Sequence, residues 1–244
     1  SLLSTNTIAM SSTGNTVNSG NGGQPLAASA QQLLLTGQSV ANSGNIIIQD
    51  TIQMLGGAGG VQQTGALVAG GLFSVSTTGD AVLGGTIQSG TNITSHSGTL
   101  LSNGEIWAFG DVTLDTATGD LTQSGTLAAN GNVALASAGQ IVQSGYLRSN
   151  DRDVLLTGAG AVLNGTIVAE GDLVVDLSGN LTTTGTLWAN DAVTLDARTL
   201  TLGGAITGLN GVDVQSAAGR SVTLTGAITS NLAVNVSAGT ISMG

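Results

Sequence analysis

Three aspartates have the clearest potential for chemistry in this chain. Asp115, Asp176 and Asp196 each follow a short apolar segment at the same phase of a repeating pattern. If Asp176 and Asp196 lie on adjacent strands, their carboxylates are about 5 Å apart, close enough to act as acid and nucleophile on a glycoside or to bind Ca²⁺. Aspartate is also common where strands end and turns begin. We therefore expect no metal site. If one exists, Asp176 and Asp196 are its candidate ligands.

Other residue types that carry catalysis are scarce. His96 is the single histidine, and the chain has no cysteine, so a thiolate metal site is excluded. No spacing supports a Ser-His-Asp arrangement, and the sequence predicts His96 in a turn formed by residues 94–97. The glycine-rich segment 56–60 lacks the lysine of a phosphate-binding loop. The sequence thus predicts no cofactor and no enzyme activity.

Large side chains at one outward phase are better candidates for binding. Trp107, Arg148 and Trp188 share this phase with Ala128 and Val168, and Tyr146 precedes Arg148 by two positions. Exposed Trp, Tyr and Arg on a surface of small residues are typical anchors for a protein partner or a sugar. Their alternative role is to cover a loop or a neighbouring strand. We name Trp107, Tyr146, Arg148 and Trp188 as candidate partner-binding residues.

These residues belong to a repeat of about 20 positions, in which three apolar columns recur eleven times. The first column is Leu33, Ile52, Phe73, Ile93, Val112, Val133, Val154, Leu173, Val193, Val212 and Leu232. The second is Leu26, Ile46, Leu67, Ile87, Ile106, Leu127, Leu147, Ile167, Leu187, Ile206 and Ile228. The third is Val40, Val61, Val82, Leu100, Leu121, Ile141, Val162, Leu181, Leu200, Val222 and Ile241. Apolar residues at i and i+2 within the segments indicate strands with one buried face. Three such strands per repeat predict the coils of an all-β parallel solenoid.

Glycine marks one corner of each repeat. It stands two residues before the second column in every repeat but the first, which has Gln24. Such a position requires either a positive φ or a close approach of the backbone between successive coils. We predict one domain, in which residues 1–22 form an irregular segment or a partial coil and 23–244 form the shaft. Bulges are expected near residues 56–60, 148–153 and 212–222.

The composition excludes several function classes. The net charge is −10, with four Arg and no Lys, which argues against binding to nucleic acid or to anionic membrane surfaces. No apolar run approaches the length of a membrane-spanning helix, so membrane insertion is not expected. Aromatic residues make up 2% of the chain, too few for a conventional globular core. Small and β-branched residues are what the narrow interior of stacked coils requires.

Two segments carry a resemblance to a known family. Residues 124–135 (SGTLAANGNVAL) and 164–173 (NGTIVAEGDL) resemble filamentous-haemagglutinin repeats. The resemblance covers roughly residues 23–244, and it implies a right-handed parallel β-helix of about eleven coils. Such repeats form the stems of two-partner-secreted adhesins and contact-dependent growth-inhibition exoproteins. The Asn-Pro motifs of the family's secretion domain do not occur here, since Pro25 is the sole proline.

The resemblance therefore implies a structural shaft, exported through an outer-membrane transporter partner and displayed at the bacterial cell surface. Its expected partner is a host-cell or bacterial surface receptor or glycan. The alternatives are a carbohydrate-active β-helix enzyme and a carbohydrate-binding solenoid. Ice binding is a further alternative, but it requires an uninterrupted threonine array, and the threonine files here are broken.

Overall fold

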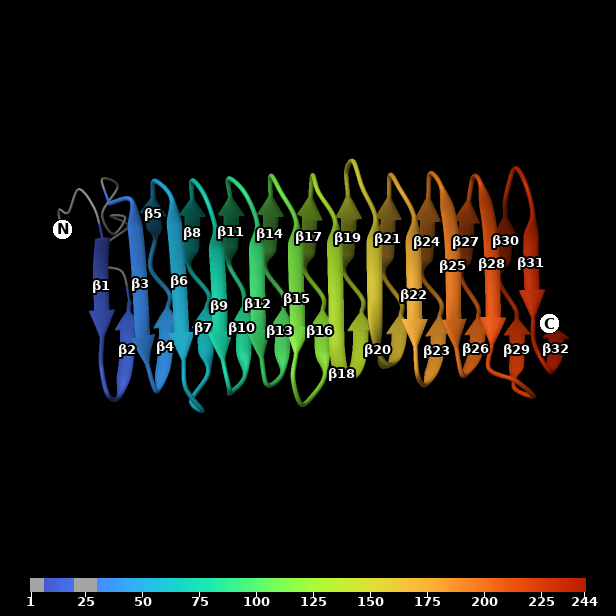
Figure 1. Cartoon of the computed structure of the whole chain (residues 1–244), viewed down its shortest axis with the longest axis horizontal. Helices are drawn as coiled ribbons and strands as arrows, with labels where there is room; N and C mark the ends of the chain where they lie inside the picture. Colours follow the sequence, from blue (N-terminus) through green and yellow to red (C-terminus); the bar gives the residue numbers. More distant parts are fainter. Residues whose placement is uncertain (1–6, 20–29) are drawn as a thin grey trace.

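The computed structural model describes residues 7–19 and 30–244, and their strands form a β-solenoid of about eleven turns of roughly 20 residues. Each complete turn contributes one strand to each of three faces, and every strand except those at the two ends pairs in parallel with its equivalents in the turns before and after it. Figure 1 shows these strands side by side along the long axis, with β1 and β32 at opposite ends. The predicted all-β parallel solenoid is confirmed.

The first face has the longest strands, with five or six residues between its two corners in every turn but the last, where the strand has four. Its strands are β1 (Thr7–Ser11), β3 (Gln32–Gly37), β6 (Thr51–Gly56), β9 (Phe73–Thr77), β12 (Ile93–Ser97), β15 (Val112–Thr116), β22 (Leu173–Leu177), β25 (Ala192–Ala197), β28 (Gly211–Ser216) and β31 (Val234–Ser237). Two strands, β18 (Val133–Gln143) and β20 (Val154–Leu163), continue through the corner onto the second face. They join the first two faces into one 22-stranded sheet.

The second and third faces are shorter. The second contains β2 (Asn15–Asn18), β4 (Ser39–Asn42), β7 (Val61–Gln63), β10 (Ala81–Leu83), β13 (Leu100–Ser102), β16 (Leu121–Gln123), β23 (Asn180–Thr183), β26 (Thr199–Leu202), β29 (Ser221–Leu224) and β32 (Thr240–Met243). The third is a separate 10-stranded sheet of β5 (Ile46–Ile48), β8 (Ala66–Ala69), β11 (Thr86–Ser89), β14 (Glu105–Ala108), β17 (Thr126–Ala129), β19 (Tyr146–Ser149), β21 (Thr166–Ala169), β24 (Thr186–Ala189), β27 (Ala205–Gly208) and β30 (Ala227–Thr229).

The core consists of the predicted columns, with three corrections. Ala81 and Ala161, not Val82 and Val162, lie in register with the third column and are buried, because the valines point outward. At the last turn, Val234 rather than Leu232 aligns with Val212, and Leu232 is 73% exposed. The first column also begins earlier, since Ile8 aligns with Leu33. Gln24, Pro25 and Leu26 lie outside the described residues.

The segment that we expected to be irregular or a partial coil contributes β1 and β2. These strands pair with β3 and β4, so residues 7–18 extend the stack by strands of two faces. The expected bulges correspond to the longer corners of the coil. Residues 57–60 form a turn closed by a hydrogen bond from Gly60 N to Gly57 O of 3.1 Å, and residues 217–220 form one closed from Arg220 N to Ala217 O of 3.0 Å.

A partly polar column lies inside the shaft on the second face, in which amide side chains share the inward position with Leu83, Ser102 and Leu163. Asn42, Gln63, Gln123 and Gln143 are at most 1% exposed and occupy the position two residues after the third column. Asn42 Nδ2 donates to Gln63 Oε1 at 2.7 Å, and Gln143 Nε2 donates to Gln123 Oε1 at 3.3 Å. Within each pair the stacked amides satisfy part of one another's hydrogen bonding, which offsets much of their burial, while Gln143 Oε1 is buried without a partner among the described residues.

The glycine corner arises from close backbone approach in nearly every turn. An added Cβ at Gly65, Gly125, Gly145, Gly185 or Gly204 would collide with the carbonyl oxygen of the equivalent glycine in the preceding turn. Only Gly85 in this column also has a positive φ, of 68°. A side chain at this corner would therefore push two turns apart.

We expect Gly204→Ala to destabilise the shaft by about 1–3 kcal/mol, as overpacking of a close contact does. Its neighbour Gly203→Ala is the matched control, because an added Cβ there meets its nearest atoms, Thr183 O and Thr225 Oγ1, at 3.3 Å. Urea unfolding followed by circular dichroism measures both variants. Equal midpoints for the two variants would contradict the close-approach explanation.

The polar column gives a second stability prediction. Asn42→Leu removes the acceptor of Asn18 Nδ2 and the donor to Gln63, so it should cost about 2 kcal/mol or more through unpaired buried groups. Ser102→Ala, in the same column, should be neutral or stabilising, because Ser102 Oγ is buried without a hydrogen-bond partner among the described residues. Thermal melts of both variants test this contrast, and a large loss for Ser102→Ala would refute it.

Candidate functional site

The third face carries the predicted file of outward side chains. Trp107 on β14, Arg148 on β19 and Trp188 on β24 are in register through Ala128 and Val168, one residue per turn. At the usual strand spacing of about 4.8 Å, the two tryptophans are roughly 19 Å apart. Both are half-buried, and Ala128, between Trp107 and Arg148, is only 6% exposed. The file is thus a narrow, mixed apolar and cationic strip.

Phe109 enlarges the aromatic end of this strip and was not identified from the sequence. It follows β14 at the corner, is 64% exposed, and packs edge-to-face on Trp107 with ring centroids 6.2 Å apart. The pair presents an aromatic surface that could stack on a sugar ring or an apolar side chain.

Arg148 is held by a residue that the sequence did not indicate. Its Nη2 donates to Glu170 Oε1 at 3.0 Å across adjacent turns, and Glu170 occupies the corner after β21. Arg148 Nε is buried without a hydrogen-bond partner in the described chain. Tyr146 lies on the same strand, in register with Thr126 and Thr166, and is half-buried. Arg148 therefore has a fixed direction, with part of its guanidinium available to a partner.

Asp176 and Asp196 are neighbours, as the spacing predicted. They lie in register on β22 and β25, on the outer side of the first face. They line a shallow hollow of about 550 Å³ together with Arg198 and Arg220, which the sequence did not place beside them. Asp115 lies three turns away, so the three aspartates do not form one cluster. Within the described residues, no group of three or more His, Cys, Asp or Glu is placed to hold a metal ion.

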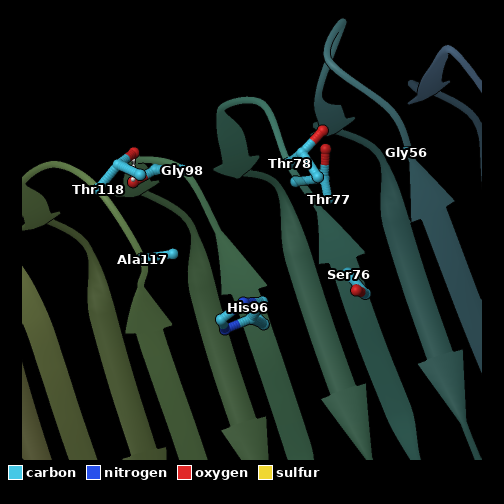
Figure 2. Close-up of a pocket in the computed structure, with 8 residues that line it drawn as sticks. All are labelled: Gly56, Ser76, Thr77, Thr78, His96, Gly98, Ala117 and Thr118. Atoms are coloured by element: carbon cyan, nitrogen blue, oxygen red, sulfur yellow. Dashed lines mark hydrogen bonds between the residues drawn. The ribbon is translucent and has the colours of Figure 1, made fainter.

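His96 lies on strand β12 and not in a turn as expected, because the period-2 alternation of residues 93–97 continues through it. Its Nδ1 is 2.5 Å from Asp115 Oδ1 on the next turn. Figure 2 shows His96 and Ser76 along the strands, beside the corner that carries Thr77, Thr78, Gly98 and Thr118. These residues line a hollow of about 250 Å³.

Ser76, His96 and Asp115 thus occupy equivalent positions of three successive turns. This order resembles the arrangement of a nucleophile, a base and an orienting acid. However, no hydrogen bond joins Ser76 to His96 in the part of the chain that the structure describes. The amides of β9, β12 and β15 are engaged in the ladder, because each strand is paired on both sides. These three strands therefore offer no free backbone amides as donors for an oxyanion.

Comparison with protein-family models, curated proteins and solved structures gave no match for this chain. Residues 7–19 and 30–244 contain no helix of the length and hydropathy needed to cross a bilayer. The candidate sites therefore rest on their own geometry.

Proposed function

We propose that this chain is the structural shaft of a large secreted bacterial surface exoprotein, which supports adhesion or presents a distal binding or toxin region. The observation that carries the proposal is the in-register stacking of about eleven equivalent turns. Eleven turns at the strand spacing give a rod of roughly 50 Å. The resemblance of residues 124–135 and 164–173 to haemagglutinin repeats supports the same assignment.

A rod of this kind fits a presenting role for a physical reason. Each turn contacts only its two neighbours, so length is added by repetition without a change of core. The inward positions are filled by the columns, and the hollows on the surface are open. The proposal includes export through an outer-membrane transporter and display at the cell surface. It includes no cofactor and no catalytic role.

The modular shaft can be tested by shortening it. Deletion of residues 133–172 removes two turns and joins residue 132 to Leu173, which is equivalent to Val133 in the register. We expect a folded chain whose rod is shorter by about 10 Å. Small-angle scattering gives the length and circular dichroism the strand content. A deletion variant that fails to fold would argue against independent turns.

A carbohydrate-binding solenoid is the second candidate, and the Trp107–Phe109 pair is the observation that favours it. Aromatic rings that face solvent stack on the apolar faces of sugars, and the Arg148 guanidinium can bind their hydroxyl or acidic groups. The partner would be a host-cell or bacterial surface receptor or glycan that lies along the third face.

Adhesion through this face predicts a specific loss. We expect the double variant Trp107→Ala, Trp188→Ala to lose most of the binding of fluorescent beads coated with the chain to epithelial cells and to a glycan array, since truncation of anchor residues costs about 2 kcal/mol or more each. The control is Gln88→Ala, Val168→Ala, which truncates two other residues of the same file. Equal binding of cells and glycans by both double variants would show that the contact does not involve Trp107 and Trp188.

A further inference from the structure

The hollow between Asp176 and Arg220 combines both signs of charge at one corner of the shaft. Asp176 and Asp196 project from the first face, and Arg198 lies at the single-residue corner between β25 and β26. Arg220 ends the four-residue corner that follows β28. The small side chains of Ala217 and Ala218 line the remaining side. The longer corner therefore forms a wall beside the two carboxylates.

The two arginines are notable because the chain has so few cations. It contains four Arg and no Lys against 14 acidic residues, and half of its arginines line this one hollow. Arg148, by contrast, is paired with Glu170. Among the described residues, neither Arg198 nor Arg220 forms an ion pair within 4.0 Å, although two carboxylates line the same hollow. Their guanidinium donors thus face solvent and are free to bind a ligand.

This combination selects for a particular ligand chemistry. A guanidinium binds a carboxylate in a bidentate manner, and an aspartate accepts hydrogen bonds from hydroxyl groups. A metal cation would be repelled by the arginines, and a simple anion by the aspartates. A ligand with one acidic group and several hydroxyls satisfies both pairs at once. The hollow of about 550 Å³ lies within the size range of small-molecule sites.

We propose that this hollow binds an acidic sugar residue, such as a uronic acid within a polysaccharide. Arg198 and Arg220 hold its carboxylate, and Asp176 and Asp196 accept hydrogen bonds from its hydroxyls. The hollow extends over three successive turns of about 4.8 Å each, because Asp176, Asp196 and Arg220 belong to successive turns. The site is on the first face, away from the tryptophans of the third. Loss of binding here would therefore leave the proposed shaft function unaffected.

The test uses tetragalacturonate as the probe and isothermal titration calorimetry at low ionic strength. We expect saturable binding that Arg198→Gln and Arg220→Gln each weaken by about tenfold or more. Arg152→Gln is the matched control, since it removes the same charge from an exposed corner on another edge of the shaft. Asp176→Asn and Asp196→Asn should also weaken binding, even though they make the surface less negative.

Several outcomes would overturn the proposal. Equal affinity for carboxyl-reduced tetragalacturonate would show that the acidic group is not recognised. An equal loss in Arg152→Gln would indicate unspecific attraction to the whole surface. Stronger binding by the two Asp→Asn variants would indicate a plain anion site, and binding that requires added Ca²⁺ would assign the carboxylates to a metal. Absence of saturation at millimolar probe would also refute the site. Circular dichroism confirms that each exposed variant remains folded.

Discussion

Parallel pairing of each turn with the next, residue on equivalent residue, is the constraint on which the whole structure depends. It places Leu127 against Leu147 and Gly125 against Gly145, and the same kind of pairing recurs from turn to turn. A side chain therefore contacts the equivalent side chain of the next turn, which is a near-copy of it in the first two apolar columns and at the glycine corner. The amide column is mixed, since Leu83 lies beside Gln63 and Leu163 beside Gln143. The hydrogen-bonded pairs Asn42–Gln63 and Gln123–Gln143 follow the same constraint as the leucines. For these two pairs, the cost of burying an amide is offset by a hydrogen bond to the amide of the adjacent turn.

The same constraint decides where chemistry can occur. Inward positions are filled by the core, and the corner of stacked glycines admits no side chain. Side chains that can reach a partner are confined to outward positions and to corners, and the corners can change in length. The corner at residues 217–220 is longer than the single-residue corner at Arg198, yet β26 and β29 resume pairing after it. An added residue at a corner thus brings a new group beside an existing file without disturbing the ladder.

The columns could be predicted because the ladder turns spacing in the sequence into contact in space. The wrong assignments in the third column arise because an apolar residue does not always point into the core. Ala81 faces the interior while the larger Val82 faces out, because the phase of the strand decides direction and side-chain size does not. The serines and threonines around His96 predict a turn, but in the structure the strand alternation continues through it. The buried glutamines show the converse: glutamine as a residue type predicts exposure, but Gln63, Gln123 and Gln143 stand two positions after the third column, at the inward phase of the strand.

The candidate sites also divide into residues on strands, which the repeat predicts, and residues at corners, which it does not. The neighbours Asp176 and Asp196 and the file from Trp107 to Trp188 were predictable, since both depend only on register. Phe109, Glu170 and the two arginines of the hollow lie at corners, where no period fixes the direction of a side chain. Equivalent outward positions recur along one axis at a spacing of about 4.8 Å, although the residue types at them vary from turn to turn. Such a surface recognises extended partners better than compact ones, because a polymer that lies along the shaft meets successive turns while a small molecule meets only one hollow.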